Sequence, residues 1–314
     1  MAKAREVLEH KAKHVILVEI QKNAAWYAGL QKDETVGRAL HELFIRADKF
    51  YTHLPDVRRE LRRQARVVEV PAAHLIVKGF GNAKVLLDGQ ELSLSDWQTQ
   101  SVRDLFFFFL SQNKPLTKEQ VAEVFWRELD DPARIRLRFK NEMYRLRRAV
   151  GNEAIIFESP VYFFNRKINY EYDVEAFESH LARARATQNI NGQIEFYRSA
   201  VEQVTGPYLN DTYFDWVVAD REKLDQMYLT SLLTLAELYK SQAQLDEALT
   251  MCQRAVEYQP FYETAYQLAM QVHHRMRNRT AILQTYEACK SALRKHLNMP
   301  PSPETEALYR KLIS

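Results

Sequence analysis

One stretch, from Asp131 to Gly151, constrains this chain more than any other, because both ends of a helix are marked in it. Asp131 has a side chain suited to cap the first free amides, and Pro132 suits the first helical position, where no N–H is needed. Gly151 favours the left-handed backbone that ends helices. Between them, apolar residues recur at steps of three and four, which predicts one buried face. The residues of that face are Ile135, Phe139, Met143, Leu146 and Val150.

The opposite face of this predicted helix is basic. At about 100° per residue, it carries Arg134, Arg138, Asn141, Tyr144, Arg145 and Arg148, with Lys140 and Arg147 on the flanks. Residues 133–150 have a net charge of +6, whereas the whole chain has +3. Arginine pairs with guanine, asparagine pairs with adenine, and further cations neutralise phosphates, so this face suits the major groove of DNA. A solvated charged face is the alternative interpretation.

The segments around this helix predict a winged helix–turn–helix. Short aliphatic strands at 75–80, 84–87 and 91–94, with a tight turn at Asp88-Gly89, form a small antiparallel sheet. Helices follow at 100–112, which holds four phenylalanines for the core, and at 117–126, which opens with a capping box. The basic helix is the third, and a hairpin of 155–157 and 161–164 is the wing. The third helix is expected to enter the groove, and Arg166 and Lys167 after the wing are candidate phosphate contacts.

From Asp173 onward the pattern is helical throughout, and Asp173 is expected to cap the first helix. Helices are predicted at 173–187, 192–204, 216–243, 245–258, 262–277, 280–297 and from 302. An internal repeat with a period of 33 residues pairs Leu235 with Leu268, Ala236 with Ala269, Ala248 with Ala281, and Ala255 with Ala288. This period indicates helix hairpins like tetratricopeptide repeats, which stack into a surface for protein partners.

The remaining sequence bounds the class of protein. Residues 1–66 are predicted to form one or two helix pairs, and their basic run at 58–66 is either a DNA-backbone contact or a solvated face or linker. No run of about 18 apolar residues predicts a membrane span, and no signal peptide is indicated, so we expect the cytoplasm. Cys252 and Cys289 are expected to be buried thiols. The fold class is therefore mostly α, divided into an N-terminal helical segment (1–70), a winged-helix domain (71–170) and a helical-repeat domain (171–314).

With these pieces placed, the sequence resembles a known group of regulators. Residues 74–170 look like the DNA-binding domain of OmpR-type winged-helix regulators, and residues 171–314 look like the bacterial transcriptional activator domain that follows it in antibiotic-regulatory activators. The motifs that carry the resemblance lie at 144–151 (Tyr-Arg-Leu-Arg-Arg-Ala-Val-Gly), 172–177 (Tyr-Asp-Val-Glu-Ala-Phe), 206–209, 215–216, 221–224, 248–260, 301–304 and 308–309.

The resemblance implies sequence-specific binding to promoter DNA, contact with RNA polymerase, and dimers on repeated sites. In larger relatives an ATPase and a helical sensor array precede this module, and residues 1–66 look like the end of such an array. Wings of this group often carry a Gly-Tyr pair, whereas this chain has Pro160-Val161-Tyr162, so a different wing turn is expected.

Other functions have less support in the sequence. The sequence has no phosphate-binding glycine loop followed by Lys-Ser/Thr, no metal-spaced His/Cys cluster and no nucleophile elbow, so we expect no enzyme, metal or cofactor. His273 and His274 are adjacent on a helix and point about 100° apart, which is poor for sharing a metal. An adaptor whose winged helix binds protein is the main alternative, because the fold serves both uses. RNA binding would need an aromatic platform on the strands, which is not evident.

The sequence thus predicts a DNA-binding transcriptional regulator, an activator, with double-stranded DNA, RNA polymerase and a second copy of itself as partners. Asn141 and Arg145 are the first candidates to read base edges, and Arg138 is the third. Tyr144 contacts a base edge or a phosphate, or it only supports the helix, and Arg134 shares their face. The expected phosphate contacts are Lys140, Arg147, Arg148 and Arg166.

Overall fold

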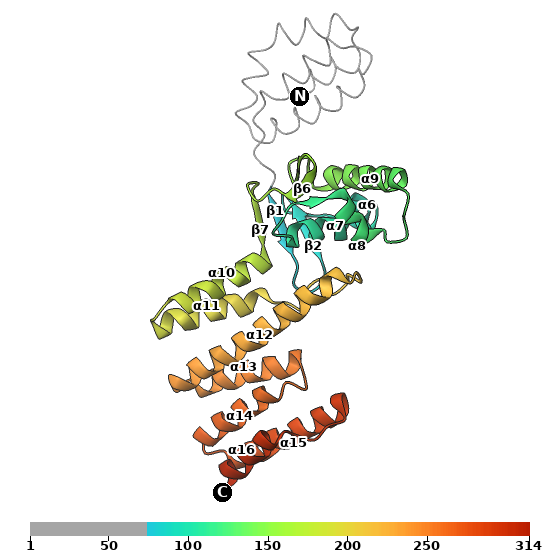
Figure 1. Cartoon of the computed structure of the whole chain (residues 1–314). Helices are drawn as coiled ribbons and strands as arrows, with labels where there is room; N and C mark the ends of the chain where they lie inside the picture. Colours follow the sequence, from blue (N-terminus) through green and yellow to red (C-terminus); the bar gives the residue numbers. More distant parts are fainter. Residues whose placement is uncertain (1–73) are drawn as a thin grey trace, which may run out of the picture. The chain divides into compact units, whose positions relative to one another are not determined.

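The computed structural model describes residues 74–314, and a four-stranded sheet opens this part of the chain (Figure 1). Strand β1 (Leu75–Lys78) pairs antiparallel with β2 (Lys84–Leu87), which pairs antiparallel with β3 (Gln90–Glu91). The predicted tight turn is confirmed, because Asp88 and Gly89 both have positive φ, 52° and 79°. The predictions for residues 1–70 lie outside the described residues.

A fourth strand, β7 (Tyr170–Tyr172), was not indicated by the sequence and lies parallel to β1. Three residues are too few to show the alternation that marks a strand. The sheet is therefore mixed and not purely antiparallel. Its last strand leads directly into the helical part of the chain, because the next helix begins at Asp173.

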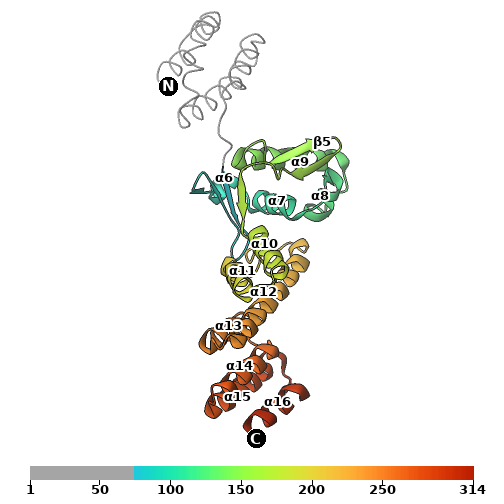
Figure 2. The ribbon, with the colours of Figure 1, turned by 90° about the vertical axis from the view of Figure 1, so that its left-hand side faces the viewer.

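The helix–turn–helix and its wing have the predicted order (Figure 2). The three predicted helices are α7 (Gln100–Ser111), α8 (Lys118–Phe125) and α9 (Pro132–Val150). A short helix that was not predicted, α6 (Leu94–Trp97), precedes them, and the strand predicted at 91–94 is shorter, since β3 ends at Glu91. The wing strands are β5 (Ile155–Glu158) and β6 (Val161–Phe164), and a short strand, β4 (Leu116–Thr117), pairs with β6. The capping box of α8 is confirmed, because Thr117 N–H donates to Gln120 and Gln120 N–H donates to Thr117 Oγ1. All four phenylalanines at 106–109 are buried in the core, as predicted.

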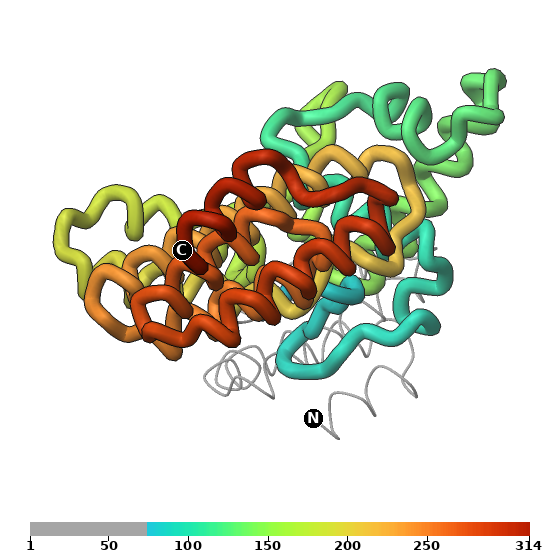
Figure 3. Tube along the Cα trace, turned by 90° about the horizontal axis from the view of Figure 1, so that it is seen from below, coloured from blue at the N-terminus to red at the C-terminus, as the bar shows by residue number. Residues whose placement is uncertain are grey.

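Antiparallel helix pairs make up the rest of the described chain (Figure 3). The helices are α10 (Asp173–Ala186), α11 (Ile190–Gln203), α12 (Trp216–Ser241), α13 (Leu245–Tyr258), α14 (Glu263–Arg275), α15 (Arg279–Leu297) and α16 (Pro303–Ile313). Their bounds lie within a few residues of those predicted. Cys252 and Cys289 are free and buried, as expected.

The predicted repeat corresponds to two helix pairs, α12 with α13 and α14 with α15. Most of the repeated residues are buried or half-buried, so the small side chains do bring helices close together. Ala288 is the exception and is exposed. It lines a groove of about 520 Å³ between α13, α14 and α15.

The winged helix and the helical part share one core, and Asp173 lies at their junction. The expectation that its side chain caps α10 was wrong. The buried carboxylate accepts hydrogen bonds from Gly79 N–H at 2.8 Å and Phe80 N–H at 3.2 Å. These amides follow the last residue of β1, and β7 brings Asp173 beside them through its pairing with β1. Burial raises the pKa of this carboxyl, and the two backbone hydrogen bonds oppose the rise.

The segment between α11 and α12 completes this junction. Leu209 N–H donates to Gly79 O at 2.8 Å, and Gly81 N–H donates to Pro207 O at 3.0 Å. Gly206 lies so close that a Cβ there would stand 3.2 Å from the Cα of Gly81. The Gly206-Pro207 break between helices is therefore a docking segment for the sheet.

Candidate nucleic-acid interface

Helix α9 begins and ends where the sequence predicts. Asp131 Oδ1 accepts a hydrogen bond from Ala133 N–H at 2.8 Å, and Pro132 occupies the first turn. Gly151 has a φ of 94°, and its N–H donates to Arg147 O at 3.0 Å. The apolar stripe faces the core, since Phe139, Met143, Leu146 and Val150 are buried and Ile135 is half-buried. The local signals therefore fix which face of the helix is left outside.

The outer face of α9 is open to solvent. Its exposed polar residues are Arg134, Arg138, Lys140, Asn141, Tyr144 and Arg148. Within residues 74–314, no side-chain hydrogen bond or ion pair is found for Lys140, Asn141 or Arg148. Their donors and acceptors are thus available to a ligand. Leu137, 61% exposed, lies among them and was not predicted as part of this face.

Two other arginines of α9 form exposed pairs with acidic side chains. Arg134 lies 3.7 Å from Asp131, and Arg138 lies 3.3 Å from Glu128. The Arg138 guanidinium also lies 5.5 Å from the ring centroid of Trp126. Exposed ion pairs of this kind contribute about 0–1 kcal/mol, so a stronger anion such as phosphate can replace the partner.

Glu142 is the single acid of α9 and is buried beneath its basic face. Its carboxylate lies 3.5 Å from Arg145, and its second oxygen, Oε2, has no hydrogen-bond partner. Burial raises the pKa of the Glu142 carboxyl, while Arg145 and then Arg138 oppose that rise. Arg145 is consequently half-buried and leans toward Glu142.

Two predicted phosphate contacts have other partners. The Arg147 guanidinium donates to Ile155 O at 3.0 Å and so ties α9 to the first wing strand. Arg166 is paired with Glu175 and donates to Leu110 O at 2.9 Å, at the end of α7. The structure therefore brings the α9 residues of the predicted site together and places Arg166 elsewhere, at the junction with α10.

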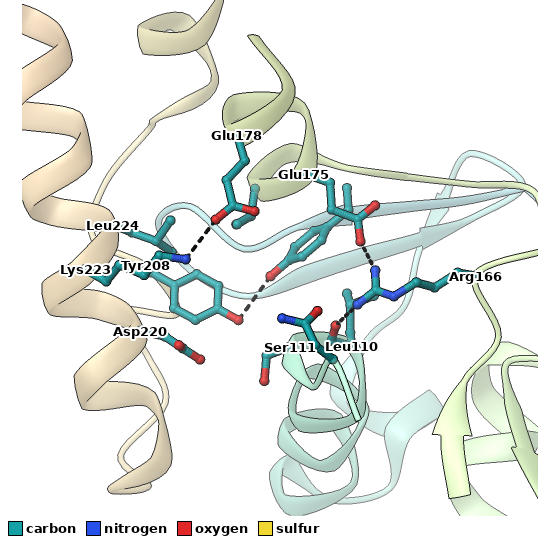
Figure 4. Close-up of a pocket in the computed structure, with 12 residues that line it drawn as sticks. Leu110, Ser111, Arg166, Glu175, Glu178, Tyr208, Asp220, Lys223 and Leu224 are labelled. Atoms are coloured by element: carbon teal, nitrogen blue, oxygen red, sulfur yellow. Dashed lines mark hydrogen bonds and ion pairs between the residues drawn. The ribbon is translucent and has the colours of Figure 1, made fainter. Parts of the chain in front are cut away.

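Arg166 lines a polar pocket of about 420 Å³ between α7, α10 and α12 (Figure 4). Lys223 is paired with Glu178 there at 3.0 Å, and Tyr172 O–H donates to the hydroxyl of Tyr208 at 3.0 Å. Both cations of the pocket thus have partners within it. These interactions join the winged helix to the helical repeats, and sequence spacing gave no signal for them because the partners lie in different elements.

Other kinds of site find little support in the described residues. Between His74 and Ser314 there is no group of three or more His, Cys, Asp or Glu side chains that would hold a metal ion. No helix in that range is long and apolar enough to cross a membrane. His273 is half-buried, and burial lowers the pKa of its imidazole.

The described part of the chain is thus a winged helix–turn–helix joined through a buried core to stacked helix pairs. Residues 172–313 match the sequence model of the bacterial transcriptional activator domain. The helical part of the chain is therefore a bacterial transcriptional activator domain.

Individual relatives agree with this assignment. The chain is 25% identical over 245 residues to the transcriptional regulatory protein MoaR1 of Mycobacterium tuberculosis, an alignment that covers 74% of this chain and 78% of MoaR1. The MoaR1 of Mycobacterium bovis matches to the same extent. A solved structure, Mycobacterium tuberculosis EmbR in complex with a low affinity phosphopeptide, superposes with a TM-score of 0.63 at 17% identity. It covers 77% of this chain but only 65% of EmbR, and it establishes the likeness of fold.

Proposed function

We propose that the protein binds double-stranded DNA sequence-specifically and activates transcription, with α9 in the major groove. The observation that carries this proposal is the outer face of α9. It presents free cations, Lys140 and Arg148, around an exposed amide, Asn141, on the second helix of a helix–turn–helix. A groove of phosphates and base edges is the ligand that matches cations and an amide on one exposed helix face.

The residues of this face have separate roles in the proposal. Asn141 reads an adenine, and Arg145 reads a neighbouring base when it turns from Glu142 toward the groove. Arg138 is the third residue proposed to read a base, and Tyr144 contacts either a base or a phosphate. Lys140, Arg148 and Arg134 neutralise phosphates. Arg147 and Arg166 would have to leave Ile155 O and Glu175 to do so, and we propose that they hold the wing and the junction in place.

The helical domain is proposed to supply the protein contacts. We assign residues 71–170 to DNA binding and residues 171–314 to contact with RNA polymerase and with a second copy of the chain. Stacked helix pairs present extended surfaces of the kind that bind proteins. Because the ligand is chromosomal DNA, we place the protein in the cytoplasm.

The test is fluorescence anisotropy of the chain with a pool of random-sequence duplexes at low and moderate salt, followed by sequencing of the retained DNA. We expect affinity that falls steeply with salt and enrichment of one repeated motif. Lys290→Ala, which removes an exposed lysine of α15, is the matched charge control and should bind like the wild type.

Absence of binding at low salt would overturn the proposal and favour the adaptor. Binding without enrichment of any motif would leave DNA binding but remove sequence specificity. A monomer both free and on DNA, measured by light scattering, would remove the second copy from the list of partners.

A further inference from the structure

Leu137 is an apolar side chain near the centre of the basic outer face of α9. It is 61% exposed and lies three residues after Arg134 and four residues before Asn141, so the three share one face. At about 100° per residue, Leu137 points within about 20° of the direction opposite the buried stripe. It therefore points the way that Asn141 and Arg148 point.

Exposure of a single leucine is ordinary on a protein surface, but a leucine near the centre of a basic helix face is unusual. The buried stripe of α9 is complete without Leu137, because Phe139 and Met143 already fill the core side of these turns. Every other residue near the centre of the face carries a polar group. A leucine at this position adds nothing to the attraction between a basic face and a charged ligand. It contributes to binding only if the ligand presents an apolar group at the same place.

The major groove presents one such group, the 5-methyl of thymine. Four residues of helix advance about 6 Å along the axis, which corresponds to about two base pairs. A leucine one turn from a base-reading asparagine is thus within reach of a neighbouring base step.

We propose that Leu137 contacts the 5-methyl group of a thymine within about two base pairs of the adenine read by Asn141. The inference rests on the proposed DNA binding and adds to it a specificity-determining residue and a feature of the operator. Arginines and the amide of Asn141 read hydrogen-bonding groups, whereas Leu137 distinguishes thymine from cytosine and from uracil by shape and burial alone.

The experiment uses the motif enriched by the full chain. Each thymine of the motif is replaced in turn by deoxyuridine, which pairs identically and lacks only the methyl group. At one position, we expect wild-type affinity to fall about fourfold, the factor that burial of one methyl group gives. With Leu137→Ala, that position should show no difference between thymine and uracil, while the other positions stay as in the wild type.

Three variants control the measurement. Asn141→Ala should bind more weakly overall but keep the fourfold ratio of thymine to uracil. Leu283→Ala, which truncates a half-exposed leucine of α15, should keep both the affinity and the ratio of the wild type. Tyr144→Ala tests the other large exposed side chain of the same face. Alanine is the best helix former, and Leu137 is outside the core, so the Leu137 variant should fold.

The outcomes separate this inference from the proposed function. A motif that binds normally with uracil at every thymine, or a uracil effect that persists in Leu137→Ala, overturns the role of Leu137 and leaves DNA binding intact. Loss of the uracil effect in Tyr144→Ala alone would move the contact to Tyr144 and likewise overturn it. Failure of the wild-type chain to bind any duplex overturns both proposals.

Discussion

Asn141 and Arg148 lie on the same exposed face of α9 but offer different chemistry to a groove. The amide of Asn141 presents a donor and an acceptor at fixed spacing, which matches adenine. Arg148 is a long cation without an ion pair among residues 74–314, and a phosphate is the simplest partner for it. The two substitutions below therefore separate base reading from charge.

Asn141→Ala should weaken binding to the selected motif by about 1–3 kcal/mol and relax the preference at one base pair. Binding to random DNA should change little, because that binding depends on charge. Competition anisotropy with both kinds of duplex makes the comparison. An equal loss on specific and random DNA would remove the base-reading role of Asn141.

Arg148→Ala should weaken binding to all sequences alike. Each neutralised phosphate contributes about 0.9 to the slope of log affinity against log salt, so the slope should become shallower by about that amount. Titrations at several salt concentrations measure it, with Lys290→Ala as the control. A loss restricted to the selected motif would show that Arg148 reads a base.

Glu142 makes the stability of the protein depend on pH in a predictable direction. The pKa of its carboxyl is raised above the ordinary 4.5 in the folded state, so between the two values the folded protein binds more protons than the unfolded chain. The free energy of unfolding therefore falls as pH rises through that interval and is constant above it.

Glu142→Gln removes this ionisation. The free energy of unfolding of the variant relative to the wild type should therefore increase as pH rises through the same interval. The increase should be about 1.4 kcal/mol for each pH unit between the two pKa values. Urea denaturation of both proteins at a series of pH values measures the difference. A difference that does not change with pH would show that the carboxyl has its ordinary pKa in the folded protein.

At the scale of elements, residues 214–216, where the segment before α12 ends and that helix begins, contact α7 and α8 from outside the winged helix. The ring of Phe214 lies 4.6 Å from that of Phe125 on α8, and the ring of Trp216 lies 5.2 Å from that of Phe108 on α7. Arg127, just after α8, is paired with Asp215 at 3.2 Å. The helices that support α9 are thus partly fixed by residues of the activator domain.

Phe214→Ala should lower the free energy of unfolding by about 1–3 kcal/mol, less than for a fully buried phenylalanine because Phe214 is half-buried. A double-mutant cycle with Phe125→Ala should give a coupling of about 0.5–1.5 kcal/mol, as expected for an aromatic pair. Tyr213→Ala is the matched control, because Tyr213 is next to Phe214 in the chain and its side chain is 88% exposed. Additive effects of the two phenylalanine variants would show that the ring pair contributes nothing of its own.

At the scale of the whole described molecule, one hydrophobic core runs from β1 to α14. A separate small cluster of buried residues, Tyr266, Cys289 and Leu293, supports α15. Helix α16 is held by Thr305, whose hydroxyl accepts a hydrogen bond from Gln267 at 2.6 Å, and by Ser302, whose N–H donates to Glu263 at 2.7 Å. Stability should therefore be shared across the junction and lower toward α16.

Native-state hydrogen exchange should show this distribution. Amides of α7 and α12 are expected to exchange with the same free energy of opening, because they belong to one core, and those of α15 and α16 to exchange sooner. If α7 opened at a clearly lower free energy than α12, the winged helix would be an independently unfolding unit and the shared core would carry little cooperativity.

The sequence by itself determined the elements whose signals are local. The caps of α9 at Asp131 and Gly151, its buried stripe, the Asp88-Gly89 turn and the period of the helix pairs depend on residues a few positions apart, so they could be predicted. The outward face of α9 follows from the same periodicity. This periodicity predicted the candidate site. Leu137 was not included, because the site was predicted from charged and polar side chains.

Only the tertiary structure decided how these elements use their remaining groups. Asp173 bonds to amides more than ninety residues earlier, Arg147 to the wing, Arg166 to the junction, and Glu142 is buried under cations. β7 exists because β1 offers it an edge. Such pairings leave no periodic trace in the sequence, since each depends on which distant backbone group is left without a partner when the sheet and helices close around one core.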